Sequence, residues 1–176
     1  MPPIDPQTVA RIRGRDGEWV ELANAVGLRV ERGPAGYVWY DGNGGLGIAD
    51  ESELDPDDTF AQIILHELCH ALTEGPAAWH QPDWGLWNED DRHVWREHAA
   101  LRLQAAILNA AGLRTTLQPT TDFRAYYLAL PDDPLQTDQV AEAETVSVAC
   151  RAWEGWLTWE HRPAVEAALA RLHLAR

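Results

Sequence analysis

The residues best suited to chemistry are two histidines and a glutamate in the segment His66-Glu67-Leu68-Cys69-His70. On a helix, His66 and His70 lie about one turn apart and share a face, so their imidazoles can bind one metal ion from the same side. Glu67 lies beside them, where its carboxylate can reach a water molecule on that metal. This spacing is typical of zinc hydrolases, in which the glutamate acts as the general base.

The flanking residues predict a helix over residues 56–74 that carries these three side chains. Asp55 suits the N-cap and Pro56 the first helical position, while Asp57 and Asp58 suit the positive end of the helix dipole. The residues that follow are apolar on nearly every side, which predicts a buried helix. Two histidines on such a helix need polar partners, so their spacing favours a metal site over an ordinary core role.

A catalytic zinc ion usually has three protein ligands, so a third ligand is expected downstream. The candidates are His80, Glu89, Asp90, Asp91, His93, Glu97 and His98. A ligand on a helix is held more firmly than one on a loop, which favours Glu97 or His98 on a helix expected over residues 91–111. The helix face that continues from Glu97 is the more apolar one, which favours Glu97. His98 remains the alternative.

These segments together resemble the ImmA/IrrE-type metallopeptidases, which are gluzincins that bind zinc through two histidines and one glutamate. The resemblance covers residues 37–108, and it rests on a hairpin, the HExxH helix and a Glu-x-x-Ala sequence on a second helix. It implies that His66, His70 and Glu97 bind one Zn²⁺ ion per chain. It also implies that Glu67 is the catalytic base of a helical, zincin-like domain.

The resemblance also gives Ala100 a role, since a small side chain one turn beyond Glu97 would let two helices approach closely enough to share an ion. Two features depart from the family. The chain has no recognisable helix-turn-helix, which some relatives carry, and its tryptophan-rich loop and C-terminal half match nothing in the family pattern. The resemblance therefore leaves the substrate open.

The remaining pattern predicts an α+β fold. Aromatic and β-branched residues at 37–40, a glycine-rich turn and an apolar segment at 46–48 are typical of a β-hairpin, and residues 28–31 look extended. Helices are expected at 5–26 with a break at 14–17, at 56–74, at 91–111, at 137–160 and from 163 to the C-terminus. We expect one domain over residues 1–176, with a small antiparallel sheet packed on the HExxH helix.

Composition argues against two classes of partner. The net charge is −14, so the basic surface that binds nucleic acid is not expected. No apolar segment approaches the length of a membrane span, and the first residues lack the features of a signal peptide. Cys69 and Cys150 are therefore expected to be reduced thiols in a cytoplasmic protein, with Cys69 in the core. The oligomeric state is not predicted.

The leading hypothesis is a zinc metallopeptidase that acts on a protein or peptide. An amidase acting on a small molecule, or a non-catalytic zinc domain that recognises a partner, would use the same ligands, but Glu67 argues against the non-catalytic alternative. Residues 75–91 form a loop whose tryptophans could contact substrate or pack internally. Candidates for stabilising an oxyanion, none of them selected by its spacing, are Tyr126, Tyr127, His98, His161 and Arg124.

Overall fold

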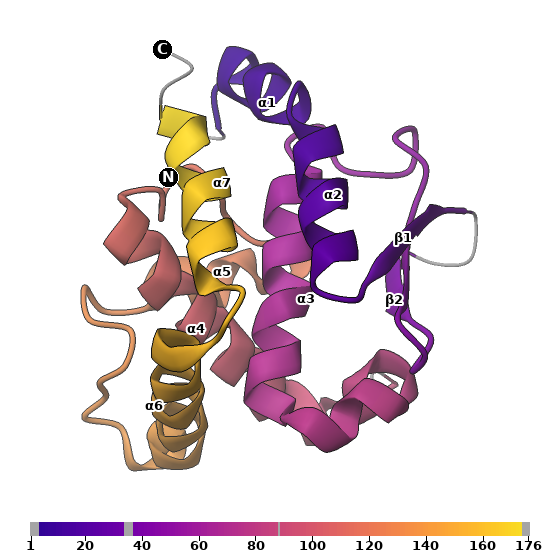
Figure 1. Cartoon of the computed structure of the whole chain (residues 1–176). Helices are drawn as coiled ribbons and strands as arrows, with labels where there is room; N and C mark the ends of the chain where they lie inside the picture. Colours follow the sequence, from indigo (N-terminus) through magenta and orange to yellow (C-terminus); the bar gives the residue numbers. More distant parts are fainter. Residues whose placement is uncertain (1–3, 34–36, 88, 174–176) are drawn as a thin grey trace.

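The computed structural model describes residues 4–33, 37–87 and 89–173 (Figure 1). Most of these residues are helical, and a small sheet lies beside the helices, so the predicted α+β class is confirmed. The chain begins with α1 (Pro6–Arg13) and α2 (Asp16–Ala25), which are separated at the predicted break. The side chain of Asp5 caps α1 by accepting a hydrogen bond from the backbone N–H of Thr8 at 3.0 Å.

The sheet has three strands in the order β1-β3-β2, formed by β1 (Arg29–Arg32), β2 (Val38–Tyr40) and β3 (Gly45–Ile48). The predicted hairpin is present, since β2 pairs antiparallel with β3. The expectation of a purely antiparallel sheet is wrong, because β1 pairs parallel with β3. The hairpin turn fixes only the direction of β3 against β2. Which strand pairs with β1 depends on tertiary contacts, and no local residue pattern encodes it.

The HExxH motif lies on α3 (Phe60–Glu74), which begins later than the predicted helix over 56–74. Thr59 is the N-cap, and its hydroxyl accepts a hydrogen bond from the backbone N–H of Gln62 at 3.3 Å. Asp58 does not enter the helix, because its carboxylate accepts from the Gln62 side chain at 2.6 Å and from a backbone N–H of the preceding turn. The acidic residues expected to start the helix therefore form a turn before it.

The loop expected at 75–91 contains three short 3₁₀ helices, η1 (Pro76–His80), η2 (Pro82–Gly85) and η3 (Asp91–His93); residue 88 lies outside the described residues. The third leads directly into α4 (Val94–Ala111). Helix α4 corresponds to the helix predicted over 91–111, and it ends at Gly112, whose φ of 66° is the left-handed conformation favoured at this position.

The C-terminal part contains α5 (Thr121–Ala129), η4 (Val140–Glu142), α6 (Ala143–Thr158) and α7 (Arg162–His173). Helix α6 is shorter than the helix predicted over 137–160. The last helix was expected to reach the C-terminus, but residues 174–176 lie outside the described residues. None of the described helices is long and apolar enough to cross a membrane.

Helix α3 runs through the middle of the molecule (Figure 1). It packs against α4 and α6 on one side and against α2 on the other, and its residues belong to the main buried cluster together with the sheet residues Leu46 and Ile48. Cys69 has no exposed surface and burial raises the pKa of its thiol, so the prediction of a core cysteine is confirmed. The helix that carries the motif is thus held from several sides.

Replacing Ala100 by leucine should lower the free energy of unfolding by about 1–3 kcal/mol, because a larger side chain overfills a packed core. Ala100 lies on α4 with no exposed surface, in the same buried cluster as the core residues of α3. Urea unfolding of the metal-free protein measures the change. Ala110→Leu, on an exposed position of the same helix, is the matched control and should change stability by less than about 0.5 kcal/mol. Equal effects of the two changes would contradict the close packing at Ala100.

Candidate metal centre

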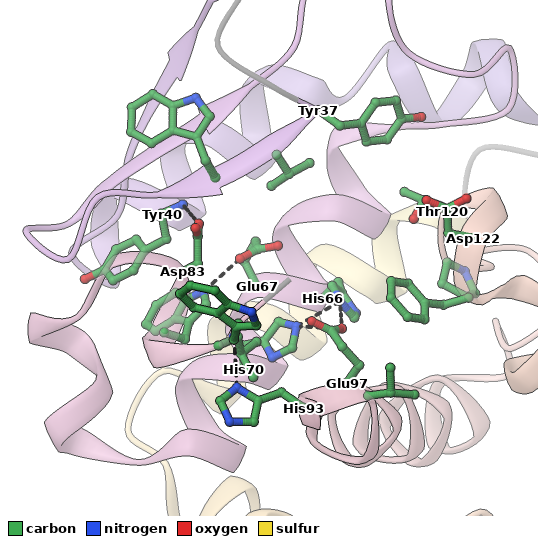
Figure 2. Close-up of a pocket in the computed structure, with 18 of the residues that line it drawn as sticks. Tyr37, Tyr40, His66, Glu67, His70, Asp83, His93, Glu97, Thr120 and Asp122 are labelled. Carbon is green, nitrogen blue, oxygen red and sulfur yellow. Dashed lines mark hydrogen bonds and ion pairs between the residues drawn. The ribbon is translucent and has the colours of Figure 1, made fainter. Parts of the chain in front are cut away.

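Three side chains that could bind a metal converge where α3 packs on α4 (Figure 2). His66 and His70 come from α3 and Glu97 from the first turn of α4. The two histidine Nε2 atoms are 3.0 Å apart. Glu97 Oε2 lies 3.2 Å from His70 Nε2 and 3.5 Å from His66 Nε2. The structure therefore brings together the three residues that the sequence and the family resemblance indicated.

The distances and the chemistry of these atoms fit a zinc ion. A tetrahedral site with bonds of about 2.0–2.1 Å places its ligand atoms about 3.3 Å apart, close to the separations found here. Glu97 Oε2 is buried, and in the described part of the chain it accepts no hydrogen bond. A buried carboxylate oxygen that faces two imidazole nitrogens provides a set of ligand atoms suited to a cation.

The ionisation of the cluster reflects the same need for positive charge. Burial would raise the pKa of Glu97, but His70 and His66 outweigh burial and hold this pKa well below its usual range. Burial would lower the pKa of His70, yet the carboxylate of Glu97 outweighs it and raises that pKa. The carboxylate is thus kept charged by the histidines, whereas binding a metal would require both imidazoles to be neutral.

A buried glutamine orients one of the two histidines. His66 Nδ1 lies 3.0 Å from Oε1 of Gln104, which has no exposed surface. Because this oxygen can only accept, Nδ1 of the neutral ring carries the proton and Nε2 presents its lone pair to the centre of the cluster. Gln104 lies two turns beyond Glu97 on α4, so helical periodicity already placed it on the same face. Its role was nevertheless missed by the sequence analysis.

The cluster opens into a cavity of about 590 Å³. Its walls come from β2, the part of α3 that carries the motif, residues on either side of position 88 between η2 and the start of α4, and residues at 119–120 and 122–123. Glu67 lines this cavity beside the two histidines, and its Oε2 accepts a hydrogen bond from Trp84 Nε1 at 2.8 Å. The Glu67 carboxylate is therefore held in place at the wall of the cavity that the cluster opens into.

The alternative third ligand, His98, does not join the cluster. Its ring stacks on Tyr126, with ring centroids 3.4 Å apart and an interplanar angle of 6°. It follows Glu97 by one residue, and a step of about 100° around α4 turns it away from α3. Burial lowers the pKa of His98, which suits a neutral, packed ring.

The five residues suggested as oxyanion donors do not line the cavity. Tyr126 donates to Glu142, Tyr127 donates to the carbonyl of Arg114, and Arg124 pairs with Asp57. The polar side chains that do line it include Tyr37, which precedes β2, and His93, at the end of η3. His93 was weighed only as a metal ligand and Tyr37 only as a strand residue, because their distance from the motif along the chain hides their position in space.

Replacing Glu97 by alanine should abolish stable zinc binding, because two histidines alone leave the site without its charged ligand. His98→Ala, the neighbouring change on the same helix, should retain about one zinc per chain. Metal content of the purified proteins, measured by mass spectrometry after zinc is supplied and excess removed, decides between them. Loss of zinc in His98→Ala alone would move the third ligand to His98.

Replacing Gln104 by methionine should weaken zinc binding about 10–100-fold, because His66 loses the acceptor that fixes its ring. Competition with a chromogenic chelator measures the zinc dissociation constant. Gln118→Met is the matched control, since Gln118 is also buried but donates to the carbonyl of Thr115 away from the cluster. An unchanged dissociation constant in Gln104→Met would show that His66 does not depend on this contact.

No protein-family model, no curated protein and no solved structure matches this chain. The resemblance to the ImmA/IrrE-type metallopeptidases therefore rests on the motif residues alone and stays a prediction. The geometry of the cluster is independent of that resemblance, since it follows from the positions of the side chains.

Proposed function

We propose that this chain is a zinc-dependent metallopeptidase that cleaves a peptide bond in a protein or peptide. In this proposal His66, His70 and Glu97 bind one Zn²⁺ ion and Glu67 is the general base. One observation carries it: three converging ligand atoms from α3 and α4 and the separate carboxylate of Glu67 on α3 line the same cavity. A purely structural zinc site has four protein ligands and needs no base, so the geometry supports catalysis.

The chemical roles follow from the positions of the side chains. When bound, zinc would act as a Lewis acid and make a water molecule a strong nucleophile near neutral pH. Glu67 would accept the proton of the attacking water and then pass it to the leaving amine. His66 and His70, held on one face of α3, and Glu97, held on α4, would keep the ion at a fixed distance from this carboxylate.

The edge of the sheet supports a peptide substrate. Strand β2 lies at one edge of the sheet and lines the cavity. Its hydrogen bonds to β3 run through Tyr37 and Asp41, so the backbone groups of Val38 and Tyr40 face the other way, where the N–H of Tyr40 already donates to Asp83 Oδ1 at 3.1 Å. An extended peptide could pair with the backbone groups of Val38 at this edge, which would lead it past the metal site.

A small-molecule amidase is the second candidate, and the cavity favours it. A volume of about 590 Å³ lies within the range of pockets that enclose small ligands, which is roughly 300–1,000 Å³. The same ligands and the same base would serve both reactions, and only the substrate would differ.

Cys69 and Cys150 are both free thiols, which supports a cytoplasmic location as part of the proposal.

Replacing Glu67 by glutamine should lower the rate of peptide hydrolysis by about 10²–10⁴-fold, because glutamine cannot accept a proton from water. Zinc content should be unchanged, since Glu67 is not one of the ligands. A library of quenched-fluorescent peptides identifies a cleaved sequence with the unaltered, zinc-loaded protein, and the variant is then compared on it. Full activity in Glu67→Gln would remove Glu67 from the role of base. Failure of the zinc-loaded protein to cleave any peptide, with turnover of small amides, would favour the amidase.

A further inference from the structure

The segment that carries Trp84 has an unusual backbone. Asp83 and Trp84 have φ angles of 46° and 57°, and Gly85 follows with 72°, so three successive residues are left-handed. This region suits glycine but is uncommon for other residues, and a bulky residue such as tryptophan adopts it only where its surroundings impose it.

Contacts to β2 and α4 hold this strained turn in place. The carboxylate of Asp83 accepts a hydrogen bond from the backbone N–H of Tyr40 at 3.1 Å. The carbonyl of Gly85 accepts one from Arg96 Nη1 at 3.0 Å. Between them the indole of Trp84 lies flat on the ring of Tyr40, with ring centroids 3.8 Å apart and an interplanar angle of 5°. The turn is therefore tied to the edge strand and to the helix that carries Glu97.

The result of this arrangement is one directed hydrogen bond. Trp84 Nε1 donates to Glu67 Oε2 at 2.8 Å, and both residues are buried, with 2% and 8% of their surfaces exposed (Figure 2). A bond from an N–H group to a carboxylate is among the stronger hydrogen bonds in proteins. This hydrogen bond holds Oε2 of Glu67 and leaves the other oxygen, Oε1, able to accept a proton. Trp84 is too deeply buried to stack on a substrate, unlike Trp87, which is 42% exposed.

We propose that Trp84 is a positioning residue for Glu67, and that the strained turn of η2 exists to aim its indole N–H at that carboxylate. This inference rests on the proposed function, because it assigns Trp84 a part in the work of the general base. A tryptophan needed only for packing would not require two adjacent non-glycine residues in left-handed conformations. The indole N–H would fix the rotation of the carboxylate, so that the free oxygen faces the attacking water in each catalytic cycle.

The activity test uses Trp84→Phe, which removes the N–H group and keeps an aromatic ring for stacking on Tyr40. On a peptide cleaved by the unaltered protein, kcat should fall about 10–100-fold, while KM stays within about twofold and zinc content is unchanged. Trp79→Phe is the matched control, because Trp79 packs edge-on against Trp84 with ring centroids 5.2 Å apart but does not hydrogen-bond to Glu67. A kcat for Trp84→Phe equal to that of Trp79→Phe would overturn the proposal.

A second measurement needs no substrate. The indole N–H resonance of Trp84, assigned by triple-resonance NMR of the unaltered protein, should move upfield in Glu67→Gln, because a neutral amide is a weaker acceptor than a carboxylate. The resonance of Trp79 should stay in place. An unmoved Trp84 resonance would overturn the proposal even if Trp84→Phe failed to fold. If the resonance moves but the zinc-loaded protein cleaves neither peptides nor small amides, the proposed function fails, and the positioning role falls with it.

Discussion

The close packing of α3 on α4 is the contact on which the candidate site depends. Helix α3 contributes the two imidazoles of His66 and His70 but cannot complete the three-residue cluster alone, since Glu97 comes from another helix. Helix α4 supplies both missing parts, the charged ligand Glu97 and the amide of Gln104 that orients His66. Because a buried carboxylate must have a positive partner, the binding of a cation at this cluster would be coupled to the packing of the two helices.

A second set of contacts positions the carboxylate of Glu67. Glu67 accepts a hydrogen bond from Trp84 of the η2 turn, and the ring of Trp84 packs in turn against Tyr40 and Trp79. The hydroxyl of Tyr40 donates to the carbonyl of Trp79 at 2.8 Å, which joins the edge strand to η1. The segment between α3 and α4 is thus a structural wall of the cavity, built on packed rings, and not an open loop.

Local patterns in the sequence were sufficient for part of this architecture. The helix that carries the motif, the hairpin, the break near Gly14 and the helix with Glu97 each follow from signals within a few residues. Other predictions were wrong for a physical reason. Helix α3 begins later than predicted because Asp58 hydrogen-bonds within the preceding turn. The sheet is mixed because β1 pairs with β3 and not with β2, its nearest neighbour in sequence. Such choices depend on contacts between segments that local propensity does not describe.

The residues that could do chemistry follow from local sequence alone, since the period of a helix converts the spacing of His66 and His70 directly into geometry. The sequence also favoured Glu97 over His98 through the apolar face of the second helix. Only the tertiary structure decided which other groups reach these side chains. Trp84 and Gln104 touch the motif because separate segments fold back on α3, and hydrogen bonds depend on distance and direction in space, which the order of residues does not state.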